Sequence, residues 1–250
     1  MRLLKSLGVA ALLVAAAASA LAQQVTVSAA ASLTEALREI GPRFEAAHPG
    51  VTLRFNFAAS GPLLQQIVQG APVDVFVSAD EETVARGVEQ KMLDEASRRV
   101  FAANTLVLIR ATQGGPELRA LPDLARPEVR RIAIGKPATT PAGRYTQQAL
   151  SAAQLWEPLQ PKLVPGDTVR QVLDYVARGE VEAGILYSTD AALMADRVQV
   201  VTVVTGHAPI RYPAVVVTDS KHKALAAEFI AFLSAPAAQD VLARRGFARP

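Results

Sequence analysis

The sequence predicts an α/β protein made of two doubly wound lobes with a ligand cleft between them. Short β-branched runs alternate with segments whose apolar residues recur at helical spacing. The strands read as nearly continuous apolar runs, which is typical of buried, mostly parallel sheets. Residues 23–250 exceed what one such sheet needs, so two lobes are expected, and a cleft between lobes is the usual ligand site.

The first half of the chain alternates from residue 25 onward. Val-Thr-Val at 25–27 is β-branched, as strands prefer. Apolar residues from Leu33 to Phe44 then recur every three or four positions, as on a buried helix face. Asp80, Glu81 and Glu82 open a later helix, where acidic side chains complement the helix dipole. The expected elements are a strand at 25–27, a helix over 33–44, a strand at 51–57, a helix over 63–68, a strand at 73–77 and a helix over 81–90.

The second half continues the alternation. Its strands are short uncharged runs, and its helices show apolar residues on one face. Val169, Val172, Leu173 and Val176, for example, share the buried face of one helix. The expected elements are strands at 106–109, 131–134, 183–187, 198–204 and 214–217, with helices over 143–153, 169–177 and 224–233.

Residues 1–22 have the pattern of a secretory signal peptide. Arg2 and Lys5 precede an uncharged apolar run over 7–18, and the small residues that end the segment predict cleavage after Ala22. The run is too short to span about 30 Å of hydrocarbon. No cysteine follows it to carry a lipid, so we expect a protein that is free in the periplasm.

Composition excludes several classes of function. With 50% hydrophobic and 20% charged residues, the chain is too apolar for intrinsic disorder. It has no cysteine, which excludes disulfides, thiolate metal sites and cysteine nucleophiles. Its net charge of +3 falls to +1 without Arg2 and Lys5, and no basic run is long enough to bind nucleic acid. We therefore expect no nucleic-acid partner.

The common signatures of enzymes are missing. The chain has no G-x-S-x-G, H-E-x-x-H, P-loop or G-x-G-x-x-G motif, and its three histidines are scattered. Ser220 to Lys223 formally matches S-x-x-K, but the companion motifs are missing and Ser220 is better interpreted as a helix cap. No catalytic residue is predicted, and the protein is not expected to be an enzyme.

What remains is a set of helix N-termini that directly follow strands. Ser32 and Glu35 have capping-box spacing, and Ser60 stands just before Pro62 at the next helix start. Two further helices open with Thr-Pro-Ala-Gly at 140–143 and Asp-Thr-Val at 167–169. First-turn N–H groups attract anions, although a serine at such a place is more often only a cap. Gly61 and Gly143 have no side chain and lie at two of these helix N-termini, as a close approach of the backbone to a ligand requires.

Six segments carry a resemblance that covers residues 23–250. The chain resembles the periplasmic molybdate-binding proteins of ABC transporters, the ModA family. The matching segments are AAASLT at 29–34, NFAASG at 56–61, GAPVDVFVSAD at 70–80, PAGRY at 141–145, VRQ at 169–171 and GILY at 184–187. Lys136 and Thr140 depart from the acidic or asparagine residue and the aliphatic residue that the family pattern leads us to expect there.

The resemblance implies a type II periplasmic binding-protein fold, with two α/β lobes joined by crossing strands. Residues 23–104 and 209–250 would form lobe I, and residues 105–208 lobe II. The chain would be a monomer that closes around molybdate, or tungstate, and delivers it to a membrane permease. No cofactor is implied, since molybdenum would enter only as the oxyanion.

The resemblance also implies the residues that hold the oxyanion by hydrogen bonds. Ser32 and Ser60 would donate through hydroxyl and backbone N–H, Ala142 and Val169 through backbone N–H, and Tyr187 through its phenol. A site with donors alone favours fully deprotonated molybdate, tungstate or sulfate over protonated phosphate. Arg144 and Arg170 follow two of these positions and are expected to form a solvated rim of the cleft.

Four alternatives stay open. A receptor for sulfate or another tetrahedral oxyanion is the nearest. A periplasmic enzyme on the same fold, such as a dehydratase, would need an acid or base at the cleft, for which Tyr187 is the candidate. The effector-binding half of a regulator would need a DNA-binding module. An iron receptor would need neighbouring tyrosines, whereas those of this chain, at 145, 175, 187 and 212, are scattered in sequence.

Overall fold

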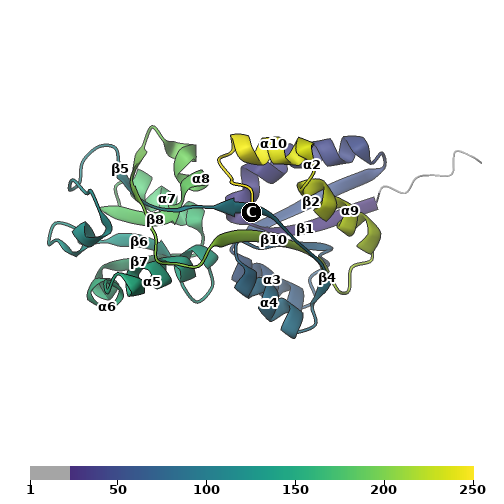
Figure 1. Ribbon diagram of the computed structural model, residues 1–250, viewed down its shortest axis with the longest axis horizontal. Helices are drawn as coiled ribbons and strands as arrows, with labels where there is room; N and C mark the ends of the chain where they lie inside the picture. The colour runs from purple at the N-terminus through teal and green to yellow at the C-terminus, as the bar shows by residue number, and fades with distance from the viewer. Residues whose placement is uncertain (1–22) are drawn as a thin grey trace, which may run out of the picture.

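The computed structural model describes residues 23–250, and the predicted signal peptide lies outside the described residues. The chain folds into two five-stranded sheets with helices on both faces of each, arranged side by side as two lobes (Figure 1). We call the lobe that contains the first strand lobe I and the other lobe II. The α/β class with two lobes is thereby confirmed.

The sheet of lobe I has the strand order β2-β1-β3-β10-β4. Strand β1 is parallel to β2 and β3, whereas β10 is antiparallel to β3 and β4. Helices α2, α9 and α10 cover one face, and α3 and α4 the other (Figure 1). The elements are β1 (Gln23–Ala30), the 3-10 turn η1 (Ala31–Leu33), α2 (Thr34–Ala47), β2 (Val51–Ala58), α3 (Ser60–Val68), β3 (Val75–Val77), α4 (Glu81–Glu89), β4 (Leu93–Asn104), β10 (Ile210–Val217), α9 (Lys223–Leu233) and α10 (Pro236–Arg244).

The sheet of lobe II has the order β7-β6-β8-β5-β9. Strand β6 is parallel to β7 and β8, and β5 is antiparallel to β8 and β9. The elements are β5 (Leu106–Ala111), η2 (Leu121–Ala125), β6 (Ile132–Gly135), α5 (Pro141–Ala152), α6 (Trp156–Leu159), η3 (Gln160–Lys162), β7 (Leu163–Gly166), α7 (Val169–Ala177), β8 (Ala183–Tyr187), α8 (Ser188–Ala191), η4 (Ala192–Met194) and β9 (Val198–Val203).

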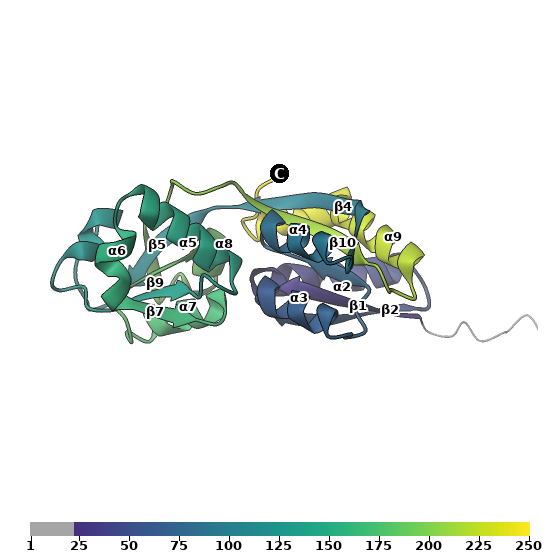
Figure 2. The same ribbon diagram turned by 90° about the horizontal axis from the view of Figure 1, so that it is seen from below.

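The chain crosses between the lobes twice. It leaves lobe I at the end of β4, where Asn104 and Thr105 lead into β5, and returns from β9 into β10 (Figure 2). Strands β4 and β10 pair with each other up to this crossing, with Asn104 opposite Ile210. Side chains near Asn104 therefore lie where the two lobes meet.

The sheets are less parallel than predicted. In each sheet, the strand that follows a crossing runs antiparallel to its neighbours: β5 in lobe II and β10 in lobe I. A strand that enters from the other lobe has no preceding helix in its own sheet to reverse the chain, and so no right-handed crossover makes it parallel.

Apart from the 3-10 turns, five elements were not predicted: the strands β4 and β7, the helix α10 and the four-residue helices α6 and α8. Strand β4 carries Asp94, Glu95, Arg98 and Arg99 and lies at a sheet edge, where charged side chains stay in solvent. Strand β7 is four residues long and contains a proline, which an edge strand tolerates. Helix α10 follows only two residues after α9.

Helices α9 and α10 complete lobe I at the C-terminal end of the chain. Glu39 of α2 accepts from Arg244 and Arg245 at the end of α10, and these contacts lower the pKa of the Glu39 carboxyl. Within residues 23–250, no single helix is long and apolar enough to cross a membrane. The pair α9 and α10, bent by 55°, reaches that length and hydropathy only when both are counted together.

Candidate functional site

A small cavity lies between the lobes, with a volume of about 20 Å³. One water needs roughly 10–15 Å³ of such space, so the lobes lie close together around this cavity. All five residues that were predicted to bind the ligand line it. The lining residues are Ala30, Ala31, Ser32, Ala59, Ser60 and Ala79 of lobe I, and Thr140, Pro141, Ala142, Thr168, Val169 and Tyr187 of lobe II.

The N-terminus of α3 leaves one backbone donor for the cavity. The first N–H groups of a helix have no intrahelical acceptor. Here the Gly61 N–H donates to the Thr139 carbonyl of lobe II at 3.1 Å, Pro62 has no N–H, and Leu63 donates back to the Ala59 carbonyl. Among the described residues, the Ser60 N–H is thus the first-turn donor of α3 without an acceptor.

The N-termini of α5 and α7 follow the same principle. In α5, Pro141 has no N–H and the Gly143 N–H donates to the Thr140 hydroxyl at 3.0 Å, so the Ala142 N–H is left without an acceptor among the described residues. In α7, the Thr168 hydroxyl accepts from the Gln171 N–H at 3.2 Å, and the Val169 N–H has no acceptor within residues 23–250. The helix starts predicted at these two places are confirmed.

Thr140 departs from the expected family pattern, and the structure gives its role. Its hydroxyl donates to the Lys136 carbonyl at 3.0 Å while it accepts from the Gly143 N–H. Thr140 therefore caps α5, and the departure does not add a donor to the cavity.

The hydroxyl of Ser60 is oriented as a donor. Its oxygen accepts the backbone N–H of Ala79 at 3.1 Å, and its side chain is buried. The hydroxyl proton is therefore left for an acceptor elsewhere, and the cavity is where Ser60 faces.

The capping box predicted for Ser32 and Glu35 is wrong. Ser32 lies in η1, and its side chain caps neither η1 nor α2. Its hydroxyl lies 3.1 Å from the Tyr212 hydroxyl, and Glu35 pairs with Arg170 of lobe II. Tertiary contacts thus take the place of the local cap that the spacing favoured.

Tyr187 presents a buried hydroxyl to the cavity. Its side chain is 1% exposed, and its hydroxyl has no hydrogen-bond partner among the described residues. Burial raises the pKa of the phenol well above its usual 10, so the group stays protonated and can donate. A buried polar group without a partner costs about 1–3 kcal/mol, which an acceptor in the cavity would recover.

No charged side chain is among the described residues that line the cavity, but charged side chains lie around it. Arg144 of lobe II donates to Asp80 of lobe I through Nε at 3.0 Å and to the Thr83 hydroxyl at 2.7 Å. Arg170 of lobe II donates to the Ala31 carbonyl at 3.2 Å. The expectation of a solvated rim is wrong, because both arginines join the lobes, and the Arg144 side chain is only 12% exposed.

Arg170 also lies next to a buried carboxylate. Asp190 of α8 is fully buried, and its Oδ1 lies 2.7 Å from Nε of Arg170 in an ion pair without hydrogen-bond geometry. Arg170 also pairs with Glu35 across the cleft. Burial raises the pKa of Asp190 to about 7, against the lowering effect of Arg170.

We expect Asp190 to make the protein less stable as the pH rises. Its pKa is about 7 in the fold and normally 3.8, so its contribution to stability is complete below pH 3.8 and is lost as the pH rises through 7. The slope reaches about 1.4 kcal/mol per pH unit. Urea unfolding at pH 5, 6, 7 and 8 should show a smaller decline for Asp190→Asn than for the wild type. The exposed Asp196→Asn is the control, and equal declines in all three proteins would contradict the prediction.

Glycine is needed at positions 61 and 143 for packing, and not for the approach of a ligand that was expected. A Cβ on Gly61 would stand 2.4 Å from the Thr139 carbonyl oxygen of the opposite lobe. A Cβ on Gly143 would stand 2.2 Å from the Gly135 carbonyl oxygen of its own lobe. Gly61 therefore permits the lobes to meet, and Gly143 permits α5 to pack on β6.

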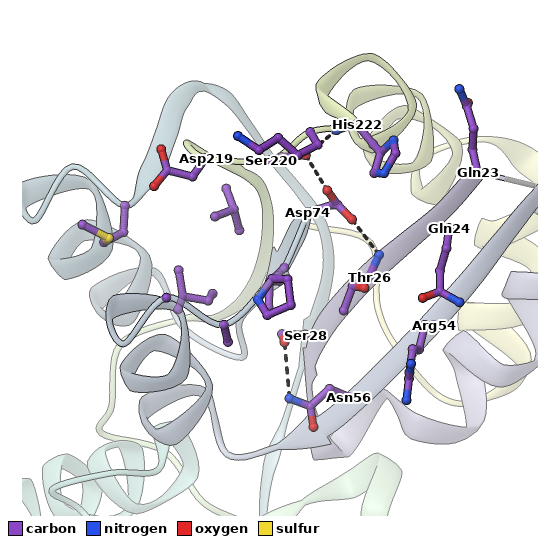
Figure 3. A pocket seen from close by; sticks show the side chains of 18 residues that line it. Gln23, Gln24, Thr26, Ser28, Arg54, Asn56, Asp74, Asp219, Ser220 and His222 are labelled. Carbon is purple, nitrogen blue, oxygen red and sulfur yellow. Dashed lines mark hydrogen bonds between the residues drawn. The ribbon is translucent and has the colours of Figure 1, made fainter. Parts of the chain in front are cut away.

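A second hollow, of about 1280 Å³, opens over the polar face of β1 and β2 in lobe I (Figure 3). Its polar groups bind one another: Asp74 accepts from the Thr26 N–H at 2.8 Å and from the Ser220 hydroxyl at 2.6 Å (Figure 3). Ser220 also accepts the His222 N–H, just before α9, so it does not cap the helix itself. None of the five predicted ligand residues lies in this hollow.

Sequence reasoning missed Asn104 and Tyr212. The Tyr212 hydroxyl contacts Ser32 and Asn104, and Asn104 also contacts Ser188 and Thr189 of lobe II. Asn104 ends an unpredicted strand, and Tyr212 precedes a proline within a predicted loop, so no local pattern marked either residue. Among residues 23–250, no group of three His, Asp or Glu side chains is arranged to hold a metal ion.

Comparisons with known proteins agree with this geometry. Residues 25–248 match the model of the bacterial extracellular solute-binding protein family. The chain is 35% identical to the molybdate-binding protein ModA of Escherichia coli (strain K12), over 95% of each chain. It is 26% identical to the solved periplasmic molybdate-binding protein of Azotobacter vinelandii, with a TM-score of 0.76 over 90% of this chain and 99% of that one. The sulfate-binding protein SubI of Mycobacterium tuberculosis shares the fold at 20% identity, with a TM-score of 0.80 over 91% and 87% of the two chains.

Proposed function

This chain belongs to the bacterial extracellular solute-binding protein family, and we propose that it captures molybdate between its lobes and delivers it to an ABC permease. Tungstate, with the same tetrahedral shape and charge, is the second expected ligand. The proposal places the protein in the periplasm, as a monomer without cofactor or catalytic activity. Relatives named for molybdate binding support the choice of ligand.

One observation supports the proposal most: residues with hydrogen-bond donors from both lobes line a cavity whose described lining residues are all uncharged. Burying a dianion is very costly unless polar groups take the place of its water. Neutral dipoles and helix N-termini provide this without a counter-ion. Each hydrogen bond to a charged acceptor contributes about 1.5–3 kcal/mol. The proposed donors are Ser32, Ser60, Ala142, Val169 and Tyr187.

The same features argue against the alternatives. A carboxylate in the lining would accept the proton of a bound hydrogen phosphate, but the lining that residues 23–250 provide has no carboxylate. A dehydratase would need an acid or base at the cavity, and among the described lining residues the Tyr187 phenol is the candidate. Tyr187 is a poor general base, because burial raises its pKa further above 10. A receptor for a fully deprotonated inorganic oxyanion fits best.

Thermal unfolding with separate oxyanions tests the proposal. A ligand at 100 times its Kd stabilises the folded state by about 2.7 kcal/mol, which raises Tm. We expect a clear rise with molybdate and with tungstate, and none with phosphate at the same concentration and ionic strength.

The control is a Ser60→Ala variant, which loses one proposed donor and should show a smaller rise with molybdate at a limiting concentration. A rise with sulfate but not with molybdate or tungstate would replace the proposal with a sulfate receptor. Turnover of an organic acid by the wild type, lost in Tyr187→Phe, would replace it with an enzyme.

A further inference from the structure

We propose that Asn104 and Tyr212 form a hydrogen-bond relay that forces the Ser32 hydroxyl to donate into the cavity, so that the site selects fully deprotonated oxyanions. The inference rests on the proposed function, since it concerns how the same cavity chooses its anion. Neither residue lines the cavity, and both would act as positioning residues through Ser32.

The orientation of the Asn104 amide fixes the start of the relay. Its Oδ1 accepts the backbone N–H of Thr105 at 2.8 Å, and a backbone N–H can only donate. The hydroxyl of Ser188 adds a second donor to the same oxygen at 3.1 Å. The amide nitrogen must therefore face Tyr212, with Nδ2 3.0 Å from the tyrosine hydroxyl.

The Tyr212 hydroxyl then has one place for its proton. Tyr212 is fully buried, and burial raises the pKa of its phenol, so the group stays protonated. Within the described residues, its hydrogen-bond neighbours are Asn104 Nδ2 and Ser32 Oγ. Since Nδ2 cannot accept, the tyrosine proton goes to Ser32 Oγ, 3.1 Å away.

The Ser32 hydroxyl, which accepts from Tyr212, can still donate its own proton. Its side chain is buried and lines the cavity, so that proton is directed to whatever occupies the cavity. Ser60 reaches the same state by another route, since Ala79 donates to its hydroxyl oxygen. The oxygen of each serine thus already accepts one hydrogen bond, so the hydroxyl proton is the group left to point to the cavity, and an anion that carries its own proton would find donors directed at it.

The position of the relay couples it to both lobes. Asn104 ends β4 at the crossing, and its Nδ2 also donates to the Thr189 hydroxyl of lobe II at 2.9 Å. Tyr212 lies in β10, and Ser32 in lobe I. The hydrogen bonds that orient Ser32 therefore depend on contacts from lobe II as well as from lobe I.

The test is a double-mutant cycle of Ser32→Ala and Tyr212→Phe, read by calorimetric titration with molybdate, tungstate, sulfate and phosphate at pH 7. Phenylalanine keeps the ring contacts of Tyr212 with Tyr187 and Phe247. We expect each single variant to lose about tenfold in affinity for molybdate. The double variant should lose little more than Ser32→Ala alone, because Tyr212 acts through Ser32.

Selectivity gives a second readout. In Tyr212→Phe the Ser32 hydroxyl regains the freedom to accept, so the preference for molybdate over phosphate should fall about tenfold. Asn104→Asp, which turns the amide donor into an acceptor, should reverse the relay and lower affinity more than Tyr212→Phe. The matched control Tyr175→Phe removes a hydroxyl that accepts from Gln171 within α7 and should change neither quantity.

The outcomes separate the relay from the proposed function. Additive losses in the cycle, or a Tyr212→Phe variant with the affinity and selectivity of the wild type, would overturn the relay while molybdate binding stands. If the wild type binds sulfate and not molybdate, the proposed function fails, and the cycle read with sulfate still decides on the relay. A wild type that binds none of the four anions overturns both.

Discussion

Gly61→Ala is expected to lower the affinity for molybdate at least about 100-fold and to lower the free energy of unfolding of the unliganded protein by only about 1 kcal/mol, the contribution of one hydrogen bond. The added Cβ would stand 2.4 Å from the Thr139 carbonyl oxygen, a backbone atom of the opposite lobe that cannot move away alone. The lobes would have to separate, and the hydrogen bond from the Gly61 N–H to Thr139 would be lost. Donors from lobe II would then no longer reach an anion held by lobe I.

The measurement pairs calorimetric titration with urea unfolding, because the prediction separates binding from stability. Gly41→Ala is the matched control: its Cβ would meet the Phe55 ring at 2.9 Å, inside lobe I. That control should lose stability and keep its affinity. If Gly61→Ala binds molybdate like the wild type, the lobes do not need the contact seen here, and the account of closure is wrong.

Tyr187→Phe is expected to weaken molybdate binding about 10–100-fold, the effect of one lost hydrogen bond to a charged acceptor. Stability of the unliganded protein should be unchanged or should rise by about 1 kcal/mol, since the substitution removes a buried hydroxyl that has no partner among the described residues. A loss of affinity without a loss of stability distinguishes a tyrosine that contacts the ligand from one that only supports the fold.

Tyr145→Phe serves as the control for this prediction. Tyr145 is also a buried tyrosine of lobe II, but it does not line the cavity. Its substitution should leave the affinity for molybdate at the wild-type value. An equal loss of affinity in the two variants would mean that Tyr187 acts through the general packing of lobe II.

Much of the fold follows from local patterns. Helix α7 is an example: its buried Val169, Val172, Leu173 and Val176 recur at the spacing of a helix face, and its predicted range of 169–177 matches the structure. Strand β8 is likewise short, apolar and buried throughout, and its range also matches. Elements of this kind bury one continuous face, so their own sequence contains the signal.

Other elements depend on partners far away in the chain. Strand β4 has the charges of a surface loop and is a strand because β10, more than a hundred residues later, pairs with it. Ser32 and Glu35 have the spacing of a capping box, yet the Ser32 hydroxyl contacts Tyr212 and the Glu35 carboxylate pairs with Arg170. At such places, contacts between residues that are far apart in sequence override local propensity, and a local pattern cannot show them.

The features of the candidate site also fall into those that local sequence predicts and those that depend on distant contacts. The helix mouths at Ser60, Ala142 and Val169 were predictable, because each follows a strand and opens with small or capping residues. That Arg144 and Arg170 would join the lobes, instead of lying in solvent, was not, because Asp80 and Glu35 lie far from them in sequence.

A crystal structure of the protein grown with tungstate tests the central claim most directly, because the metal's anomalous scattering locates the anion without assumptions. We predict one strong peak in the cavity between Ser32 and Tyr187, with oxygen atoms within hydrogen-bond distance of the Ser60, Ala142 and Val169 N–H groups. A peak in the hollow over β1 and β2 instead, or an anion held by an arginine or lysine side chain, would contradict the account.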